Sequence, residues 1–363
     1  MSGLPDVKET SSTCAACPKA CRFSCPVSEA TQNESLSAWG KMSAVHHVVT
    51  GQRPLDADTA SAIHACTGCG RCTSFCSHEN PVAHSLFGAR QLAVSAGLQP
   101  RGAASTLATF QQAQNPFGHE LGSLVASWRA QRPVRYPLFP GCSSLVKRPA
   151  LIEQTLAVAD AFGAPMGVAK TASKCCGYPL FAAGSFEAFA SHARAVAEAF
   201  VETPEVAVLD AGCAYTFRKL YPQFGVKFPT RMRTVVEVLH ENLPHAPDRP
   251  PLPERVGYHD ACHLGRGLGL YDEPRALLSR AVTAIVEAPS MRREAGCSGG
   301  GGLVPRTMPE TSVEIARRQA AEISEDTNVT VVTGCPTSTR MFERAGRRAI
   351  DLVSLLERWV TQT

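Results

Sequence analysis

Two short stretches of the chain hold eight closely spaced cysteines. CAACPKACRFSCP at residues 14–26 contains four of them, and CTGCGRCTSFC at residues 66–76 contains the other four. The second stretch has the spacing C-x2-C-x2-C-x3-C. This spacing is typical of ferredoxins, where three close thiolates bind one iron–sulfur cube and the fourth binds its neighbour. The two stretches therefore predict a pair of 4Fe–4S clusters.

The same rule divides the eight thiols between the two predicted clusters. One cluster is expected to bind Cys66, Cys69, Cys72 and Cys25. The other is expected to bind Cys14, Cys17, Cys21 and Cys76. The first stretch has one extra residue before Cys21, and the second has Ser77 where ferredoxins have proline. One residue adds at most about 3.5 Å of reach, so a loop absorbs it and no ligand is lost.

Zinc sites and disulfides are the alternatives for these thiols. C-x2-C pairs also bind zinc, but a tetrahedral site needs no third cysteine so close. The start, MSGLPDVKETSS, lacks the apolar core of a secretory signal, and no apolar run reaches the roughly 18 residues of a membrane span. We therefore expect a cytoplasmic protein, a compartment where disulfides are rare. Iron–sulfur chemistry is favoured over both alternatives.

The composition of the 363 residues is that of a soluble globular protein, with 44% hydrophobic and 19% charged residues. The net charge of +4 is mild and no basic tract marks a nucleic-acid partner. Residues 1–130 are predicted to form a helical domain, because the cysteine stretches are separated by helical patterns such as Leu36–Val49 and Ser85–Ala96. Such helices would hold two clusters rigidly near each other.

Residues 134–245 and 254–363 have a different pattern. Short apolar runs alternate with amphipathic helices, and this predicts two α/β domains with mainly parallel sheets. The clearest helices are Phe186–Phe200 and Val313–Ile323, with Ser185 and Thr311 as expected N-caps. Five prolines in residues 244–253 predict a linker between the two domains.

The two α/β domains read as copies of one unit. Three short cysteine motifs of the first domain recur in the second. FPGC corresponds to YHDAC, KCCG to GCSG, and DAGC to TGC, at offsets of 120, 122 and 122 residues. Cysteine loops would then follow the carboxyl ends of the strands, where open α/β sheets place their sites. The glycine run at residues 299–302 is read as a flexible loop beside such a site, because it lacks the spacing of a phosphate-binding loop.

These motifs resemble the paired cysteine-rich CCG domains. FPGC…KCCGYPL…DAGC followed by YHDACHLGR…GCSGGGG…GCPTS is similar to the subunits of heterodisulfide reductases and to the iron–sulfur subunits of glycolate and lactate oxidoreductases. Many members place an α-helical ferredoxin domain before two CCG domains, which is the order here. The resemblance implies an iron–sulfur cluster held by the pattern C…CCG…C-x-x-C.

The two copies depart from that pattern to different degrees. The first copy has four of the implied ligands, with Thr216 in place of the last cysteine: Cys142, Cys175, Cys176 and Cys213. The second copy has three, with Ser298 and Ser338 at the other positions: Cys262, Cys297 and Cys335. A hydroxyl is a poor ligand beside a thiolate. A third cluster is therefore expected in the first copy, and the second copy is the weaker candidate.

The expected function is electron transfer within a multi-component oxidoreductase. Electrons would enter from a partner, expected to be a flavoprotein, and leave to a quinone, a disulfide or another protein. A quinone-linked partner would place the chain at the inner face of the membrane. The alternative is a thiol–disulfide reductase that acts at the first CCG site. No acid–base pair marks an organic-substrate site, so no catalytic residue is assigned.

Overall fold

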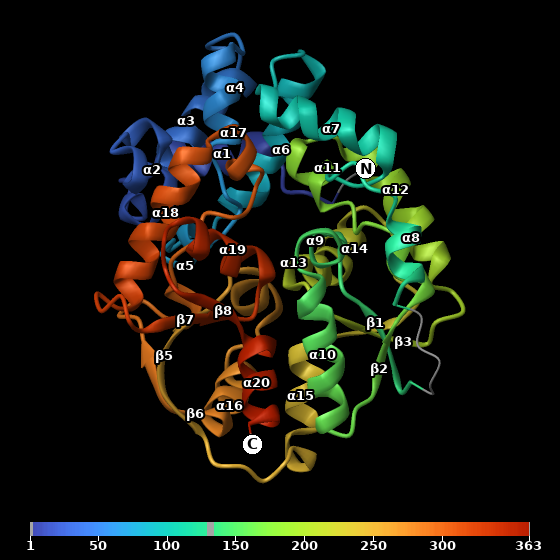
Figure 1. The fold of residues 1–363 in the computed structure, drawn as a ribbon. Helices are drawn as coiled ribbons and strands as arrows, with labels where there is room; N and C mark the ends of the chain where they lie inside the picture. Colours follow the sequence, from blue (N-terminus) through green and yellow to red (C-terminus); the bar gives the residue numbers. More distant parts are fainter. Residues whose placement is uncertain (1–2, 129–133, 363) are drawn as a thin grey trace.

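The computed structural model describes residues 3–128 and 134–362. A helical N-terminal part lies against two four-stranded sheets that stand side by side (Figure 1). The helical part contains α1 (Val7–Ala15), α2 (Pro26–Thr31), α3 (Ala38–Val49), α4 (Ala57–His64), α5 (Arg71–Ser74), α6 (Val82–Ser95), α7 (Arg101–Ala113) and α8 (Leu121–Ala126). This arrangement confirms the predicted fold class, a helical domain followed by two repeated α/β domains.

Polar side chains fix where the helices around the cysteines begin. Ser37 Oγ accepts a hydrogen bond from the Gly40 amide at 3.1 Å, so α3 begins at Ala38, two residues after the predicted start. Asp56 caps α4 in the same way, because its Oδ1 accepts a hydrogen bond from the Thr59 amide at 2.7 Å. The predicted helix at Ser85–Ala96 is α6, which begins three residues earlier, after Pro81.

The first α/β copy has the strand order β2-β1-β3-β4, and all its paired strands are parallel. Its strands are β1 (Tyr136–Phe139), β2 (Met166–Val168), β3 (Glu205–Val208) and β4 (Arg231–Thr234). Its helices are α9 (Cys142–Lys147), α10 (Pro149–Ala161), α11 (Tyr178–Ala183), α12 (Phe186–Ala199), α13 (Ala211–Tyr215), α14 (Tyr221–Gln223) and α15 (Val235–Glu241).

The second copy repeats this topology in the order β6-β5-β7-β8, again with parallel pairs. Its strands are β5 (Leu252–His259), β6 (Val282–Glu287), β7 (Thr330–Thr333) and β8 (Ala349–Asp351). Its helices are α16 (Asp272–Ala281), α17 (Val304–Thr307), α18 (Pro309–Ile323), α19 (Pro336–Arg344) and α20 (Leu352–Thr361). The repeat seen in the cysteine marks is therefore a repeat of the fold.

Several local predictions need correction. Each copy has a fourth strand that the apolar pattern missed, because β4 has the polar sequence RMRT and β8 is only three residues long. Ser185 precedes α12 but makes no capping hydrogen bond. Thr311 lies inside α18, which begins at Pro309, a residue whose fixed φ suits the first helical turn. β5 begins at Leu252, two residues inside the predicted linker.

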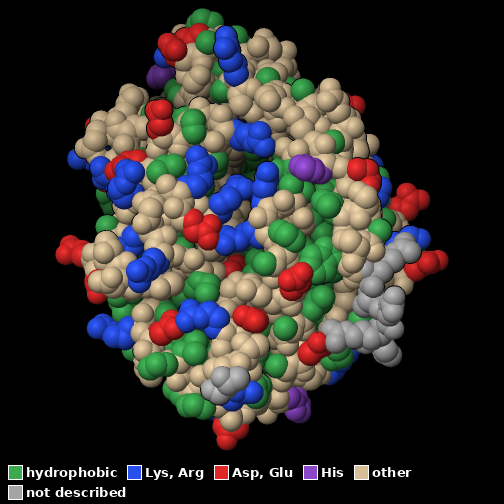
Figure 2. All heavy atoms as spheres, in the orientation of Figure 1, with side chains coloured by type: hydrophobic (Ala, Val, Ile, Leu, Met, Phe, Trp, Pro, Cys, Tyr) green, Lys and Arg blue, Asp and Glu red, His purple; other side chains and the backbone are tan. Residues whose placement is uncertain are grey.

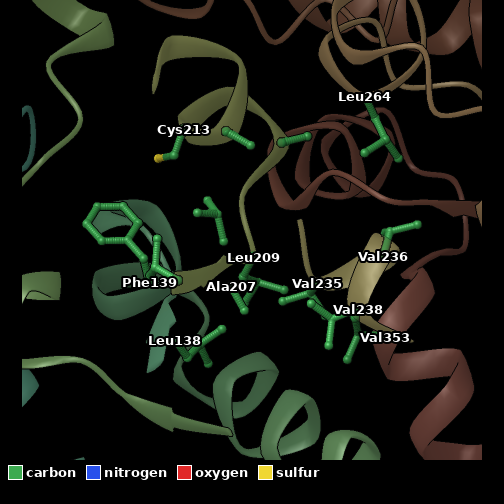
Figure 3. Packing of buried hydrophobic residues seen from close by; sticks show 14 of the residues in the cluster. Leu138, Phe139, Ala207, Leu209, Cys213, Val235, Val236, Val238, Leu264 and Val353 are labelled. Atoms are coloured by element: carbon green, nitrogen blue, oxygen red, sulfur yellow. The ribbon is translucent and has the colours of Figure 1, made fainter. Parts of the chain in front are cut away.

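The two α/β copies share one hydrophobic core. The largest cluster of buried apolar residues includes Leu138 and Val238 of the first copy together with Leu264 and Val353 of the second. Figure 3 shows Val238 close to Val353 at the junction of the copies. Burial of these apolar residues at the junction fixes the orientation of the copies, so their cysteine loops face one another. Among residues 3–128 and 134–362, no helix combines the length and apolar character needed to cross a membrane.

Candidate iron–sulfur sites and the cavity between the copies

The first group of thiols, called here the inner site, consists of Cys25, Cys66, Cys69 and Cys72. These four residues border one small cavity. Gly68 and Gly70, both with φ of +72°, turn the chain between the last three of them, in a conformation that glycine adopts without strain. Cys25 reaches the cavity from the residue before α2. The structure thus brings Cys25 to the second cysteine stretch, as the predicted ligand division requires.

Lys41 is a buried cation at the inner site that the sequence analysis missed. Its Nζ lies 3.4 Å from Cys25 Sγ and donates to the Ala65 carbonyl at 2.7 Å. Burial pulls the pKa of Lys41 down, but the nearby thiols of Cys25, Cys66 and Cys72 raise it above its ordinary value. A buried ammonium so close to thiolates stabilises negative charge at the inner site.

Replacing Lys41 by methionine is expected to lower the reduction potential of a cluster at the inner site by on the order of 100 mV. A unit charge at roughly 6 Å and an effective dielectric constant of about 20 contributes about 3 kcal/mol, and 59 mV corresponds to about 1.4 kcal/mol for one electron. EPR-monitored redox titration measures the shift. Lys8→Met, an exposed lysine on α1, is the control. Equal potentials in both variants would contradict the role of Lys41.

The second group, called here the outer site, consists of Cys14, Cys17, Cys21 and Cys76. Burial raises the pKa of Cys14 to about 12, and the thiols of Cys21, Cys76 and Cys17 add to the increase, so all four lie close together. Asn80 Nδ2 donates to Cys14 Sγ at 3.1 Å. The outer site thus gathers the other predicted ligand set.

The extra residue of the first stretch is absorbed by a tight turn. Lys19 adopts φ of +65°, and its carbonyl accepts a hydrogen bond from the Arg22 amide at 3.0 Å. Such a left-handed residue reverses the chain within a few residues. Cys21 therefore still reaches Cys14 and Cys76. Lys19 and Arg22, which the sequence places inside this loop, lie 3.4 Å and 3.7 Å from Glu34.

The thiols of the first copy form a chain of contacts. Cys142 follows β1, Cys175 and Cys176 lie in the loop before α11, and Cys213 lies in α13 after β3. The sulfurs of Cys142 and Cys175 are 3.5 Å apart. Hydrogen bonds from the Cys175 and Cys213 thiols hold the pKa of Cys176 well below its ordinary value. Cys176 is therefore the thiol of this group that most readily becomes a thiolate ligand.

The residue that replaces the fifth cysteine of the first copy does not act as a spare ligand. Thr216 Oγ1 donates to the Gly212 carbonyl at 2.7 Å, within the first turn after Asp210. Its hydroxyl also contacts Cys176. The Gly212 carbonyl thus accepts the one hydroxyl proton of Thr216, and four thiols remain to hold a cluster.

The two residues of the second copy that depart from the cysteine pattern are in contact with each other. Ser298 and Ser338 stand where the pattern has cysteines, and their hydroxyls are buried and hydrogen-bonded to each other at 2.8 Å. Cys297 lies beside Cys69 of the inner site, and this contact raises the pKa of the Cys297 thiol. Cys335 lies near Asp210 of the first copy. The remaining thiols of the second copy therefore face neighbours outside that copy.

One cavity lies between the two copies and is bordered by all seven of their cysteines. The cysteine loops meet there because they follow strands whose carboxyl ends face the same space. Two π-helical turns, Thr216–Leu220 and His263–Gly267, follow Cys213 and Cys262, and such turns are frequent at functional sites. His263 borders the cavity and stacks on Tyr215 with ring centroids 4.6 Å apart. His259 is buried and contacts the Thr333 hydroxyl at 3.1 Å.

The glycine run of the second copy packs against the inner site. A Cβ at Gly301 would lie 2.2 Å from the Thr67 carbonyl oxygen, and one at Gly302 would lie 2.0 Å from that of Cys66. The expectation of a flexible loop is therefore wrong, because these glycines let two backbones touch. Arg266 joins the same parts of the chain by donating to the Cys69 carbonyl at 2.7 Å.

Arg71 also ties the cysteine loops to the second copy, through the Glu294 carbonyl at 2.9 Å. The sequence could have indicated its cationic character but not its partner. Arg90, which the sequence analysis missed, is buried and donates to five carbonyls from three parts of the chain. No local pattern marks either contact, because their partners lie far away in sequence.

The inner and outer sites each offer four free thiols, the ligand set that a 4Fe–4S cluster takes. In a cube each thiolate binds its own iron, so the ligands surround the cluster instead of meeting at one point. The buried cation Lys41 and the amide of Asn80 beside the sulfurs also fit thiolate ligands.

Comparison with known protein families gives two matches. The cysteine-rich CCG domain matches residues 136–218 and 256–343, once in each α/β copy. The 4Fe-4S dicluster domain matches residues 10–80, which contain the inner and outer sites. Both matches agree with the resemblance stated from the motifs.

Several proteins from methanogens are similar to the chain. A subunit of the fumarate reductase (CoM/CoB) of Methanothermobacter marburgensis is 26% identical over 301 residues, 81% of this chain and 60% of that protein. An iron–sulfur protein of Methanocaldococcus jannaschii is 28% identical, over 76% of this chain and 55% of that protein. A subunit of the dihydromethanophenazine:CoB–CoM heterodisulfide reductase of Methanosarcina barkeri is 24% identical, over 77% and 71%. The chain thus spans little more than half of the first two relatives.

Proposed function

Because the chain belongs to the iron–sulfur proteins that join a 4Fe-4S dicluster domain to two cysteine-rich CCG domains, we propose that it transfers electrons as a subunit of a multi-component oxidoreductase. The proposal is supported by relatives that are named as subunits of reductases. The single observation that carries it is the contact of the inner site with the cysteines of the second copy. That contact joins the dicluster domain to the cavity between the copies.

We assign the domains to residues 1–130, 134–245 and 254–363, and three clusters to the chain. The proposed ligands are those of the inner site, those of the outer site, and Cys142, Cys175, Cys176 and Cys213 of the first copy. Clusters bound there would supply one-electron chemistry. The chain supplies the ligands, the spacing and the charges, of which Lys41 is the closest to the inner site. The second copy is proposed to hold no cluster of its own, which its paired hydroxyls support.

The order of the sites supports a path through the molecule. Burial raises the pKa of the Cys72 thiol of the inner site, and the nearby thiol of Cys21 of the outer site adds to the increase. Burial likewise raises the pKa of Cys262 of the second copy to about 11, and the Cys69 thiol of the inner site adds to the increase. Cys262 in turn borders the cavity and lies near Cys335. Short steps between neighbouring sites favour electron transfer from the outer site toward the cavity.

The surface beside the outer site is proposed to receive the redox partner. Phe23 is 51% exposed, although its ring packs edge-on against Phe75 with centroids 4.8 Å apart. Exposed aromatic residues and cations such as Arg22 are enriched at protein interfaces. A flavoprotein is the proposed donor, because flavins convert two-electron oxidations into single-electron steps. A membrane-bound partner would hold the chain at the inner face of the membrane.

Iron and sulfide analysis of anaerobically purified protein tests the cluster assignment. We expect about twelve irons per chain, falling to about eight in Cys176→Ser, because the first copy would lose a ligand. Cys335→Ser is the matched control in the second copy, and its iron content is expected to stay at about twelve. Bound zinc without sulfide, or an equal loss of iron in both variants, would contradict the assignment.

A thiol–disulfide reductase is the second candidate, and the cavity favours it because thiols of both copies border one space. Disulfide turnover of the wild type and of Cys176→Ser separates the candidates. If the chain reduces disulfides at the first copy, Cys176→Ser abolishes disulfide turnover while about eight irons remain reducible by the donor. If it only passes electrons to another protein, wild type shows no disulfide turnover at all.

A further inference from the structure

The cysteine loop of the second copy lies against the inner site. Cys297 occupies the position in the repeat that Cys175 occupies in the first copy. Cys175 contacts Cys142 of its own copy, with the two sulfurs 3.5 Å apart. Cys297 Sγ lies 3.5 Å from the hydroxyl oxygen of Thr67 in the second cysteine stretch, and Cys297 packs with Cys69 in one cluster of buried residues. Equivalent thiols of the two copies therefore have different neighbours.

We propose that the Cys297 thiol donates a hydrogen bond to the Cys69 sulfur and thereby raises the reduction potential of a cluster at the inner site. Cys69 is one of the four proposed ligands of that cluster, so the inference rests on the proposed function. A hydrogen bond to a ligand sulfur stabilises the negative charge that the cluster gains on reduction, and the potential rises as a result. The second copy thus sets the potential of a cluster that it does not itself bind.

The Cys297 thiol has one proton and two acceptors within reach. One acceptor is Thr67 Oγ1 at 3.5 Å. The other is the Cys69 sulfur, which lies within hydrogen-bond reach of the Cys297 side chain. A thiolate that binds iron carries negative charge, which a hydroxyl oxygen lacks, and charged acceptors form the stronger hydrogen bonds. The proton of Cys297 therefore points to Cys69 once a cluster occupies the inner site.

The loop around Cys297 holds the thiol in place. The Gly299 amide donates to Cys297 Sγ at 3.2 Å, and Ser312 Oγ of α18 donates to the Gly299 carbonyl at 2.8 Å. An added Cβ at Gly299 would lie 2.3 Å from the Ser312 carbonyl oxygen, so the loop and α18 are in close contact. The amide takes a lone pair of the Cys297 sulfur and leaves the thiol proton to be donated. A donor fixed in this way needs little rearrangement when the cluster gains charge.

A buried hydrogen bond affects the inner site more directly than charges at the surface do. Lys and Arg side chains gather around a hollow on the face that Figure 2 shows, but water and salt screen the charges there. Cys297 and Cys69 are only 4% and 8% exposed. In such surroundings the effective dielectric constant is low, and a hydrogen bond is electrostatically stronger than in water. The contact between these two sulfurs is therefore well placed to shift the potential.

An EPR-monitored redox titration of the anaerobic holoprotein tests the proposal. In Cys297→Ala one midpoint potential is expected to fall, so that the ratio of reduced to oxidised cluster at the wild-type midpoint drops roughly fivefold, which is about 40 mV for one electron. Cys297→Ser keeps a donor, so it is expected to restore most of the potential. Both variants are expected to keep the iron content of the wild type, because Cys297 is not a ligand. Cys335→Ala removes another thiol of the second copy and is the matched control, with that midpoint unchanged.

Loss of about four irons in both Cys297 variants would overturn the proposal, because it would make Cys297 a cluster ligand. Full iron with unchanged midpoints, or equal shifts in both variants, would also overturn it and would leave the proposed electron-transfer role standing. A wild type without a cluster at the inner site would contradict the proposed function as well. Proton ENDOR of the reduced wild type in H2O and D2O needs no variant. An exchangeable proton coupled to the cluster is expected, and its absence would refute the hydrogen bond even if Cys297→Ala failed to fold.

Discussion

Replacing Arg90 by methionine is expected to lower the thermal unfolding midpoint of the holoprotein by roughly 8 °C and to release iron from the inner site. The buried guanidinium donates to the carbonyls of Ile63, His64, Cys66, Ala182 and Gly302. These groups belong to the dicluster domain and to both copies. Methionine fills similar space but leaves five buried acceptors without a donor, which costs about 4 kcal/mol after partial relaxation. In a chain of this length, each kcal/mol of lost stability lowers the unfolding midpoint by roughly 2 °C.

Two further variants make this test specific. Arg101→Met removes an exposed arginine at the start of α7, and it is expected to change the midpoint by less than about 2 °C. Arg90→Lys keeps the charge but reaches fewer carbonyls, so an intermediate midpoint is expected. Circular dichroism and iron analysis measure both effects. If Arg90→Met kept the iron content and the unfolding midpoint of the wild type, the guanidinium of Arg90 would not be the group that joins the three domains.

Gly302→Ala is expected to have the second largest effect, the loss of about four irons per chain. The added Cβ would lie 2.0 Å from the Cys66 carbonyl oxygen, a distance at which the backbone must move. Gly302 also has φ of +60°, which alone costs an alanine about 1 kcal/mol. Movement of the Cys66 backbone displaces a proposed ligand of the inner site, so the cluster there is lost while the other sites keep theirs.

Gly346→Ala separates these two causes. Gly346 has φ of +78°, but nothing lies within 4 Å of the position of an added Cβ. This control therefore carries the backbone strain without the steric clash, and we expect it to keep its full iron content. Iron, sulfide and the visible absorbance of the clusters are compared in the two variants. Equal iron contents would show that the second copy can move away from the inner site without disturbing it.

The cysteine pattern was sufficient to predict much of the architecture. The ferredoxin rule predicted a division of the eight N-terminal thiols into two ligand sets, and the structure brings the four thiols of each set together. The ligand sets themselves stay a prediction. The repeated marks predicted two parallel sheets, since strands and loops alternate at a fixed offset. The fourth strand of the first copy was not predicted, because an edge strand with the sequence RMRT has no continuous apolar run.

The contacts between domains could not be predicted, and they contain most of the new information about the sites. Lys41 lies in an ordinary amphipathic helix, and only the packing of α3 against the cysteine loops places its ammonium beside Cys25. Arg90 and the glycine run depend on neighbours more than 200 residues away, such as the Arg90–Gly302 pair at a separation of 212. Local periodicity carries no information about such partners.

The hydroxyl pair of Ser298 and Ser338 makes the two walls of the cavity chemically different. The two copies that enclose it share one topology, so an intact repeat would present matching sets of thiols to the cavity. Here one wall offers four thiols, and the other offers three thiols and two hydroxyls that already satisfy each other. The two walls of the cavity are therefore chemically unlike. The difference between the copies in sequence places the complete set of four proposed cluster ligands on one side of the cavity only.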